Sequence, residues 1–246
     1  MDDREQFAQK NREMVKAMAG NPELCQRSRG WFDASFRMEY PYHFRWLGVP
    51  IIQYPQDIVA MQELVWEIKP DLIIETGIAR GGSLILYASL QQLIGKGEVL
   101  GIDIDIRAHN RKAIESHPMA SRITMFEGSS VTDEMGERVR QFATGHQTVL
   151  VVLDSNHTHE HVLRELELYA PLVTPGSYCV VFDTVVEDMP PGSFPDRPWD
   201  IGNNPKTAAR EYLKSHPEFE IDRTIPDKLQ ITVAPDGYLR RKQSCG

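Results

Sequence analysis

Acidic residues stand where five apolar runs of the chain end. They are Glu75, Asp103, Glu127, Asp154 and Asp183. In open α/β sheets, ligands gather beyond the carboxyl ends of the strands, so these carboxylates would line one polar crevice. Mutual repulsion raises the free energy of such a group unless a cation, a ligand or hydrogen bonds offset it. The pattern predicts a site for a polar or cationic ligand along one sheet edge.

A glycine-containing turn follows the first of these carboxylates. Glu75 ends an apolar run, and Gly77, Ala79, Gly81 and Ser83 lead into a helical pattern. A strand, a tight turn and a helix N-terminus form the unit that holds nucleotide-like cofactors. The dinucleotide fingerprint G-x-G-x-x-G is absent, and an acidic residue just before the glycine is typical of class I methyltransferases. There the carboxylate takes the methionine end of S-adenosylmethionine. The alternative is an ordinary β–α turn.

The next two strand ends would extend this cofactor site. Asp103 lies 28 residues after Glu75, where a carboxylate can hydrogen-bond both ribose hydroxyls, with Ile104 beside it. The same spacing suits a nicotinamide cofactor, and a helix N-cap is a third interpretation of Asp103. Gly128 and Ser129 would lie near the adenine.

A second group of polar residues follows the last two strands. Asp154 and Asp183 end neighbouring strands, so both could bind one hard cation such as Mg²⁺, which prefers oxygen ligands. Such a cation would lower the pKa of a substrate hydroxyl. His157 has the chemistry of a general base near neutral pH. A metal-free hydrogen-bonded pair and a structural histidine are the alternatives.

The elements that position these residues alternate along the chain. This alternation predicts an α/β fold, a single doubly wound Rossmann-like domain with a mostly parallel sheet. Two closing apolar segments, 219–225 and 229–234, predict an antiparallel hairpin at the sheet edge. Strands are expected over 72–76, 98–102, 122–126, 148–153 and 177–182, and helices over 57–68, 82–94, 107–116, 132–143, 158–170 and 205–215.

The chain divides into two parts. Residues 1–56 hold a charged helix over 2–19 and an aromatic-rich segment, 28–56, which is either a non-repetitive arm or a lid over a substrate pocket. Residues 57–246 are expected to form the S-adenosylmethionine-dependent methyltransferase domain. The loop 183–204 is long, and long loops are often functional lids. Its Asp196, Arg197 and Trp199 could meet a sugar face, or the loop could be a plain surface or oligomer contact.

Composition narrows the function classes. The net charge of −8 and the pI of about 5.5 argue against nucleic acid. No apolar run approaches the roughly 20 residues of a membrane span. Cys25, Cys179 and Cys245 are scattered, which fits a reducing cytoplasm.

Several segments together resemble one family. The chain is similar to the cephalosporin hydroxylase-like and rhamnosyl O-methyltransferase family, within the class I S-adenosylmethionine-dependent methyltransferases. The resemblance covers roughly residues 45–242. The segments that carry it are GVPIIQYPQD at 48–57, KPDLIIETG at 69–77, GGS at 81–83, GIDID at 101–105, LDSNH at 153–157, GNNPKTA at 202–208 and APDGYL at 234–239.

The resemblance implies an S-adenosylmethionine-dependent O-methyltransferase that acts on a rhamnosyl or other deoxyhexose unit, with a divalent cation. It places Glu75, Gly77 and Ser83 at the methionine part of the cofactor and Asp103 at its ribose. Asp154 is expected to be a catalytic, a cofactor-binding and a metal-binding residue, and His157 to be the catalytic general base. Related enzymes carry Glu-Asp after the next strand, whereas this chain carries Phe182-Asp183. Thr184, Glu187 or Asp188 could supply the missing ligand.

Two other functions stay open. One is an NAD-dependent oxidoreductase on the same kind of sheet, which the missing G-x-G-x-x-G disfavours. The other is a non-catalytic cofactor-binding partner of a biosynthetic enzyme, which Phe182 favours. The acceptor is expected to be a small sugar or glycoside, and a homo-oligomer is left open.

Overall fold

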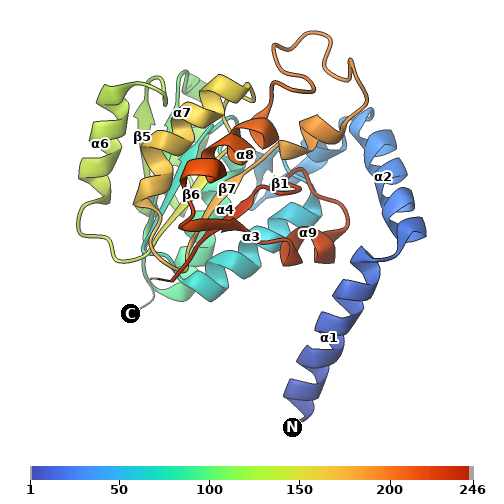
Figure 1. Cartoon of the computed structure of the whole chain (residues 1–246). Coiled ribbons are helices and arrows are strands. Elements are labelled where there is room, and N and C mark those ends of the chain that lie inside the picture. The colour runs from blue at the N-terminus through green and yellow to red at the C-terminus, as the bar shows by residue number, and fades with distance from the viewer. Residues whose placement is uncertain (1, 244–246) are drawn as a thin grey trace.

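The computed structural model describes residues 2–243, so Cys245 lies outside the described residues. A seven-stranded sheet runs through the centre in the order β5-β4-β3-β6-β7-β9-β8 (Figure 1). All pairs from β5 to β7 are parallel, and β9 is antiparallel to both of its neighbours. The strands are β3 (Leu72–Thr76), β4 (Glu98–Asp103), β5 (Ile123–Glu127), β6 (Val149–Leu153), β7 (Tyr178–Val181), β8 (Phe219–Ile221) and β9 (Tyr238–Arg241).

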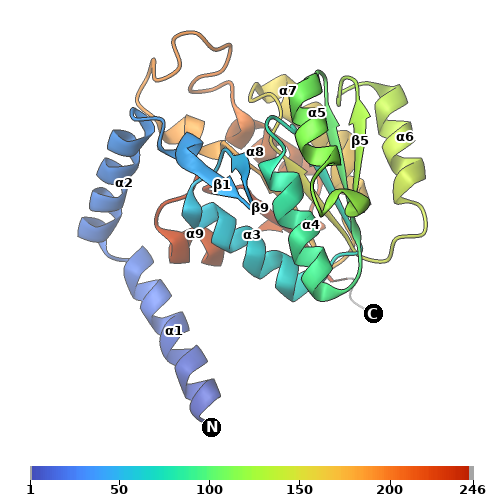
Figure 2. The same cartoon turned by 180° about the vertical axis from the view of Figure 1, so that it is seen from behind.

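Helices cover both faces of this sheet (Figures 1 and 2). One core layer lies under α3 (Pro55–Ile68), α4 (Gly82–Ile94) and α5 (Ala108–Glu115). The other lies under α6 (Asp133–Ala143), α7 (His159–Tyr169) and α8 (Pro205–Ser215). Short 3₁₀ turns join the elements at Ala120–Arg122, Ala170–Leu172 and Thr184–Asp188. The predicted doubly wound α/β fold is therefore confirmed, and two helices, 82–94 and 205–215, keep their predicted bounds.

The predicted edge hairpin is only partly correct. An antiparallel pair does close the sheet, but its strands are β8 and β9. Residues 229–234 are not a strand. The segment before them forms α9 (Thr224–Leu229), and the backbone N–H of Val233 donates to the buried Asp57 carboxylate. The Asp57 side chain, on α3, therefore accepts a backbone hydrogen bond that a neighbouring strand would accept if this segment were a strand.

The N-terminal segment is more regular than predicted. After α1 (Asp3–Ala19), a second helix α2 (Pro22–Phe36) covers the start of the range expected to be non-repetitive, because Asn21 caps it and Pro22 begins it. A 3₁₀ turn (Tyr40–His43) leads to the hairpin of β1 (Phe44–Trp46) and β2 (Val49–Ile51).

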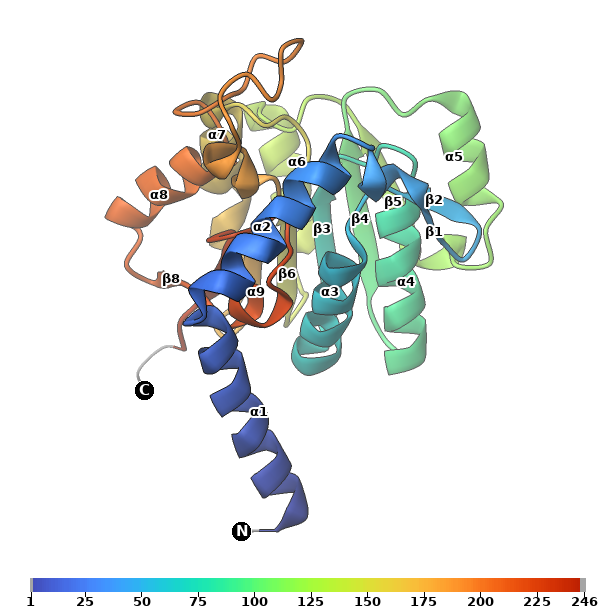
Figure 3. The same cartoon turned by 90° about the vertical axis from the view of Figure 1, so that its right-hand side faces the viewer.

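The two N-terminal helices differ in how they pack. Figure 3 shows α1 projecting from the body of the molecule, and none of its residues is buried. Phe32 of α2 stacks on the fully buried Tyr54 at 4.9 Å between ring centroids, and both belong to the core that contains the sheet. Among the described residues, no helix is long and apolar enough to cross a membrane.

Asp57 ties the first core layer to the end of the chain. Its side chain is fully buried and accepts hydrogen bonds from the Thr232 hydroxyl, from Val233 N at 3.0 Å and from Tyr238 Oη at 3.1 Å. Burial raises the pKa of Asp57 to about 6, although these donors lower it. One carboxylate therefore fixes the loop between α9 and β9.

We expect Asp57→Ala to lower the free energy of unfolding by roughly 2 to 4 kcal/mol, because three buried donors lose their acceptor. Asp57→Asn, which keeps one acceptor oxygen, should cost less. Urea denaturation of both variants measures this. A loss under about 0.5 kcal/mol for Asp57→Ala, the range of ordinary surface changes, would contradict the assigned role.

Candidate active site

The turn between β3 and α4 lies directly against the end of β6. Gly77 has φ +91°, and a Cβ at this position would lie 2.0 Å from the backbone oxygen of Asp154. Gly81 (φ +88°) and Ala79 (φ 46°) also adopt left-handed conformations. Only glycine allows both the approach and the conformation at residue 77. The turn therefore brings the two predicted groups of site residues into contact.

Asp103 organises this turn from the end of β4. Its Oδ2 accepts from the backbone N–H of Ile78 at 2.8 Å and of Ala79 at 3.2 Å, and its Oδ1 accepts from Asp105 N at 3.1 Å. Asp103 is not the N-cap of α5, because that helix begins at Ala108 after Arg107. The N-cap alternative is wrong.

Glu75 is a buried carboxyl group with one unpaired oxygen. Its residue is 1% exposed, and Ser83 Oγ donates to Oε2 at 2.7 Å. No described residue hydrogen-bonds to Oε1. Burial raises the pKa of Glu75 to about 8, and the nearby charge of Asp103 adds to this shift. A cationic ligand group beside Oε1 would favour the ionised form and supply the missing donor.

A pocket opens beside this carboxyl group. Its walls are the segment 50–53 before α3, the turn 77–83 and Asp154. The predicted cofactor residues Gly77, Ala79, Gly81, Ser83 and Asp154 thus line one pocket.

The predicted adenine side lies at the next strand end. Gly128 N donates to the backbone oxygen of Asp103 at 2.8 Å, so the loop after β5 adjoins the end of β4. Ser129 follows in the same loop, and its backbone oxygen accepts from Thr132 Oγ1. Ile104, which follows Asp103 at the end of β4, is 73% exposed and offers an apolar surface.

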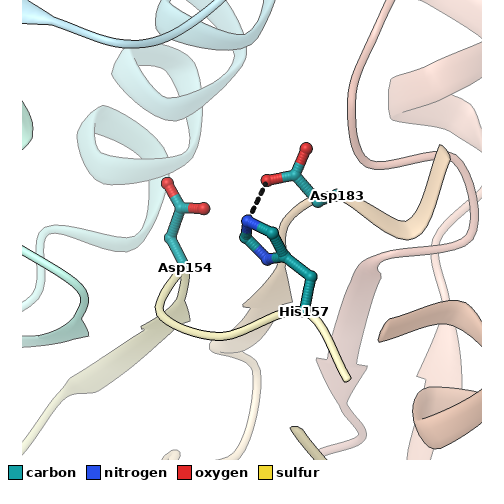
Figure 4. A group of neighbouring side chains, drawn as sticks. All are labelled: Asp154, His157 and Asp183. Atoms are coloured by element: carbon teal, nitrogen blue, oxygen red, sulfur yellow. Dashed lines mark ion pairs between the residues drawn. The ribbon is translucent and has the colours of Figure 1, made fainter. Parts of the chain in front are cut away.

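Asp154, His157 and Asp183 converge at the ends of β6 and β7 (Figure 4). One ligand atom from each lies within 4.8 Å of the other two, and His157 Nε2 is 3.4 Å from Asp183 Oδ2. Burial raises the pKa of Asp154 well above its usual range, and the charges of Asp183 and Glu75 raise it further. Two hard oxygens and an imidazole nitrogen at this spacing fit a divalent cation, which would relieve that repulsion.

Thr184 does not join this cluster, contrary to its prediction as a ligand. The residue is fully buried, and its hydroxyl donates to the backbone oxygen of Pro235 at 2.6 Å. Glu187 accepts from Gly202 N and Asn204 Nδ2, and Asp188 pairs with Lys206. His157 takes the third position in the cluster.

Two further residues contact this cluster from segments distant in the chain. Gln53 Nε2 donates to Asp154 Oδ2 at 3.2 Å, a contact between residues 101 positions apart. The Trp199 ring lies edge-on to His157, with 4.7 Å between ring centroids. Gln53 is 8% exposed in the structure. In the sequence its only signal is that a glutamine stands between apolar neighbours.

The loop that carries Trp199 also contacts the N-terminal segment. Phe194 meets Phe36 of α2 at 5.5 Å between ring centroids, and Arg197 lies 5.3 Å above the Trp199 ring. The aromatic segment therefore contacts the long loop, whose Trp199 packs against His157.

The fold and the site define a Rossmann-like methyltransferase domain. The family described as "Rhamnosyl O-methyltransferase/CmcI" matches residues 38–242. The chain therefore belongs to this family, and its class is that of the S-adenosylmethionine-dependent O-methyltransferases.

Individual relatives agree with this assignment. A rhamnosyl O-methyltransferase of Mycobacterium leprae is 30% identical over 200 residues, 80% of this chain and 82% of the relative. CmcI with magnesium and S-adenosylmethionine has a TM-score of 0.57 at 20% identity, over 81% of this chain and 77% of CmcI. The MycE methyltransferase of mycinamycin biosynthesis, in complex with Mg, S-adenosylhomocysteine and mycinamycin VI, has a TM-score of 0.51 at 16% identity, over 87% of this chain and 56% of MycE. At these identities the two structures show a shared fold.

Glu75 should make the stability of the free protein fall as pH rises. Its pKa is 4.5 as the ordinary value and about 8 when folded, so between these values only the folded state keeps the proton. The contribution is lost at about 1.4 kcal/mol per pH unit in this window. In Glu75→Gln this slope should be absent, so the variant should gain stability relative to the parent from pH 5 to 8.

Denaturation of both proteins across that pH range measures the difference. A constant difference between parent and Glu75→Gln would contradict the raised pKa, whatever the absolute stabilities. Glu127→Gln, at a half-exposed carboxylate paired with Arg111, is the control and should show no such trend.

Proposed function

We propose that this chain transfers the methyl group of S-adenosylmethionine to a hydroxyl of a sugar, a rhamnosyl or other deoxyhexose unit, with the help of a divalent cation. The observation that carries the proposal is the contact between the glycine turn and the Asp154–His157–Asp183 cluster. Methyl transfer to oxygen needs a donor site and a proton acceptor side by side, and the close approach of Gly77 to Asp154 supports such an arrangement. The names of the rhamnosyl O-methyltransferase and the glycoside complex of MycE support a sugar acceptor.

In this proposal, the pocket around the turn holds the methyl donor. Glu75 takes the ammonium of the methionine part, and Gly77, Ala79, Gly81 and Ser83 surround that part. The other contacts follow the strand ends outward: Asp103 and Ile104 would meet the ribose, and Gly128 and Ser129 the adenine.

Asp154 and Asp183 would hold the cation, with His157 beside it. A bound Mg²⁺ would supply Lewis acidity and orient the acceptor hydroxyls. Asp154 is the anchor of the site, because its backbone contacts the turn while its side chain faces Asp183.

His157 would remove the proton from the attacking hydroxyl at Nε2. That atom lies near the Asp183 carboxylate, which favours the imidazolium formed on proton transfer. The Trp199 ring packs against the imidazole and limits its rotation. The 189–203 loop and the N-terminal segment, residues 1–56, would wall the acceptor space. Positioning and electrostatics would supply most of the rate.

The alternatives have less support. An NAD-dependent oxidoreductase is disfavoured because this chain lacks the G-x-G-x-x-G fingerprint. A non-catalytic binding partner was suggested by Phe182, but Asp154 and Asp183 lie in one cluster with His157 without a carboxylate at position 182, and Phe182 is a buried core residue. We place the enzyme in the cytoplasm, because Cys25 and Cys179 are free thiols in the described residues.

We expect His157→Ala to lower turnover by roughly 10²-fold or more, because the general base is lost. Affinity for S-adenosylhomocysteine should stay within about twofold, because the ring is not in the donor pocket. Steady-state kinetics with a rhamnosyl acceptor and calorimetry measure the two effects.

The matched control is His146→Ala. This histidine pairs with Glu98 at the start of β4, at the opposite edge of the sheet, and its loss should leave turnover unchanged. Normal turnover in His157→Ala would remove His157 from the mechanism.

Removal of divalent cations should abolish turnover. We expect EDTA to inactivate the enzyme and excess Mg²⁺ to restore it, because the clustered carboxylates bind the acceptor only through a cation. Asp183→Asn should raise the Mg²⁺ concentration for half-maximal activity about tenfold or more, the order of effect seen when a metal site loses a supporting interaction. Full activity after exhaustive EDTA treatment would rule out the metal-assisted route but not methyl transfer.

A further inference from the structure

We propose that Gln53 binds the α-ammonium group of the methyl donor and joins it to the cation site through Asp154. The inference rests on the proposed function, and it adds a ligand from outside the glycine turn. It makes the segment before α3 part of the donor site.

The first argument is position. Gln53 lies between β2 and α3, is 8% exposed and lines the pocket together with the turn 77–83. The segment is fixed there by close packing, because a Cβ at Gly82 would lie 2.3 Å from the Pro50 backbone oxygen. Gln53 therefore faces the donor pocket from a backbone that has little room to move.

The second argument is the direction of the amide. With a cation bound, Asp154 is a carboxylate and can only accept hydrogen bonds, so the NH₂ of Gln53 faces Asp154 Oδ2 and the amide oxygen faces elsewhere. No described residue donates to that buried Oε1. A buried carbonyl without a hydrogen-bond donor is unfavourable, so a ligand that donates to it gains affinity.

The third argument is the kind of ligand group that fits. Glu75 Oε1 is a second buried acceptor without a described partner, and its Oε2 is held by Ser83, another residue of the pocket wall. Acceptors of this kind, with the Asp154 carboxylate nearby, repel an anion. A primary ammonium offers three N–H donors and a positive charge, so it matches both acceptors at once. The amino group of methionine has this chemistry.

The test compares two ligands that differ only in this group: S-adenosylhomocysteine and its desamino analogue. Calorimetry with the full chain gives the affinity ratio between them. We expect the parent to prefer S-adenosylhomocysteine, and Gln53→Met, similar in length but without the amide, to reduce that preference about tenfold. Gln53→Glu keeps an acceptor oxygen and should retain most of the preference. Gln92→Met, on the exposed end of α4 where Gln92 accepts from Arg122, is the control.

Each outcome decides the question. An unchanged preference in Gln53→Met, or an equal loss of affinity for both ligands, would overturn the contact and leave Gln53 as a wall of the pocket. If Gln53→Met does not fold, loss of the preference in Gln53→Glu overturns it instead. Failure of the parent to bind either ligand would overturn the proposed function as well, which separates the two conclusions.

Discussion

Repulsion among buried carboxylates at one sheet edge is the constraint on which the site depends. Burial raises the pKa values of Glu75 and Asp154; the charge of Asp103 raises that of Glu75 further, and the charges of Asp183 and Glu75 raise that of Asp154 further. A protein gains no stability from such crowding, so its purpose lies in what binds there. The proposed ligands, a donor with an ammonium group and a divalent cation, both carry the positive charge that relieves it.

The strand order gives the two proposed ligands separate but neighbouring positions. Across the sheet β4, β3, β6 and β7 are neighbours, so their end residues run Asp103, Glu75, Asp154 and Asp183. The chain order reverses between β3 and β6, which is where α/β folds bind ligands. The proposed donor pocket lies at the turn after β3, and the proposed cation cluster lies at the ends of β6 and β7. Gly77 touches Asp154 at the junction, where the transferred methyl would pass.

Local sequence signals predicted most of the central sheet and the glycine turn. Apolar runs with an acidic end placed the central strands, and the glycine spacing placed the turn. The strand prediction that failed depended on a contact between residues distant in the chain. Residues 229–234 resemble a strand in their apolar content, but Asp57, 176 positions before Val233, holds that segment as a loop. The helix at 22–36 was not predicted, because Asn21 and Pro22 directly follow the end of one helix and also begin the next.

The site residues show the same division. Those at strand ends could be predicted, because a parallel sheet gathers its carboxyl ends at one edge. Thr184 was misplaced because the chain turns at Asp183 with φ 54°, after which the next side chain points into the core. Gln53 and Trp199 reach the cluster from segments whose course no local pattern fixes, and only the folded chain brings them to Asp154 and His157.

The most direct test of the account is calorimetric titration of the protein with S-adenosylhomocysteine and, separately, with NAD⁺, each with and without magnesium. The account predicts saturable binding of S-adenosylhomocysteine at one site per chain and none of NAD⁺. Binding of NAD⁺ without binding of S-adenosylhomocysteine would contradict the roles of Glu75 and Asp103 and the proposed reaction.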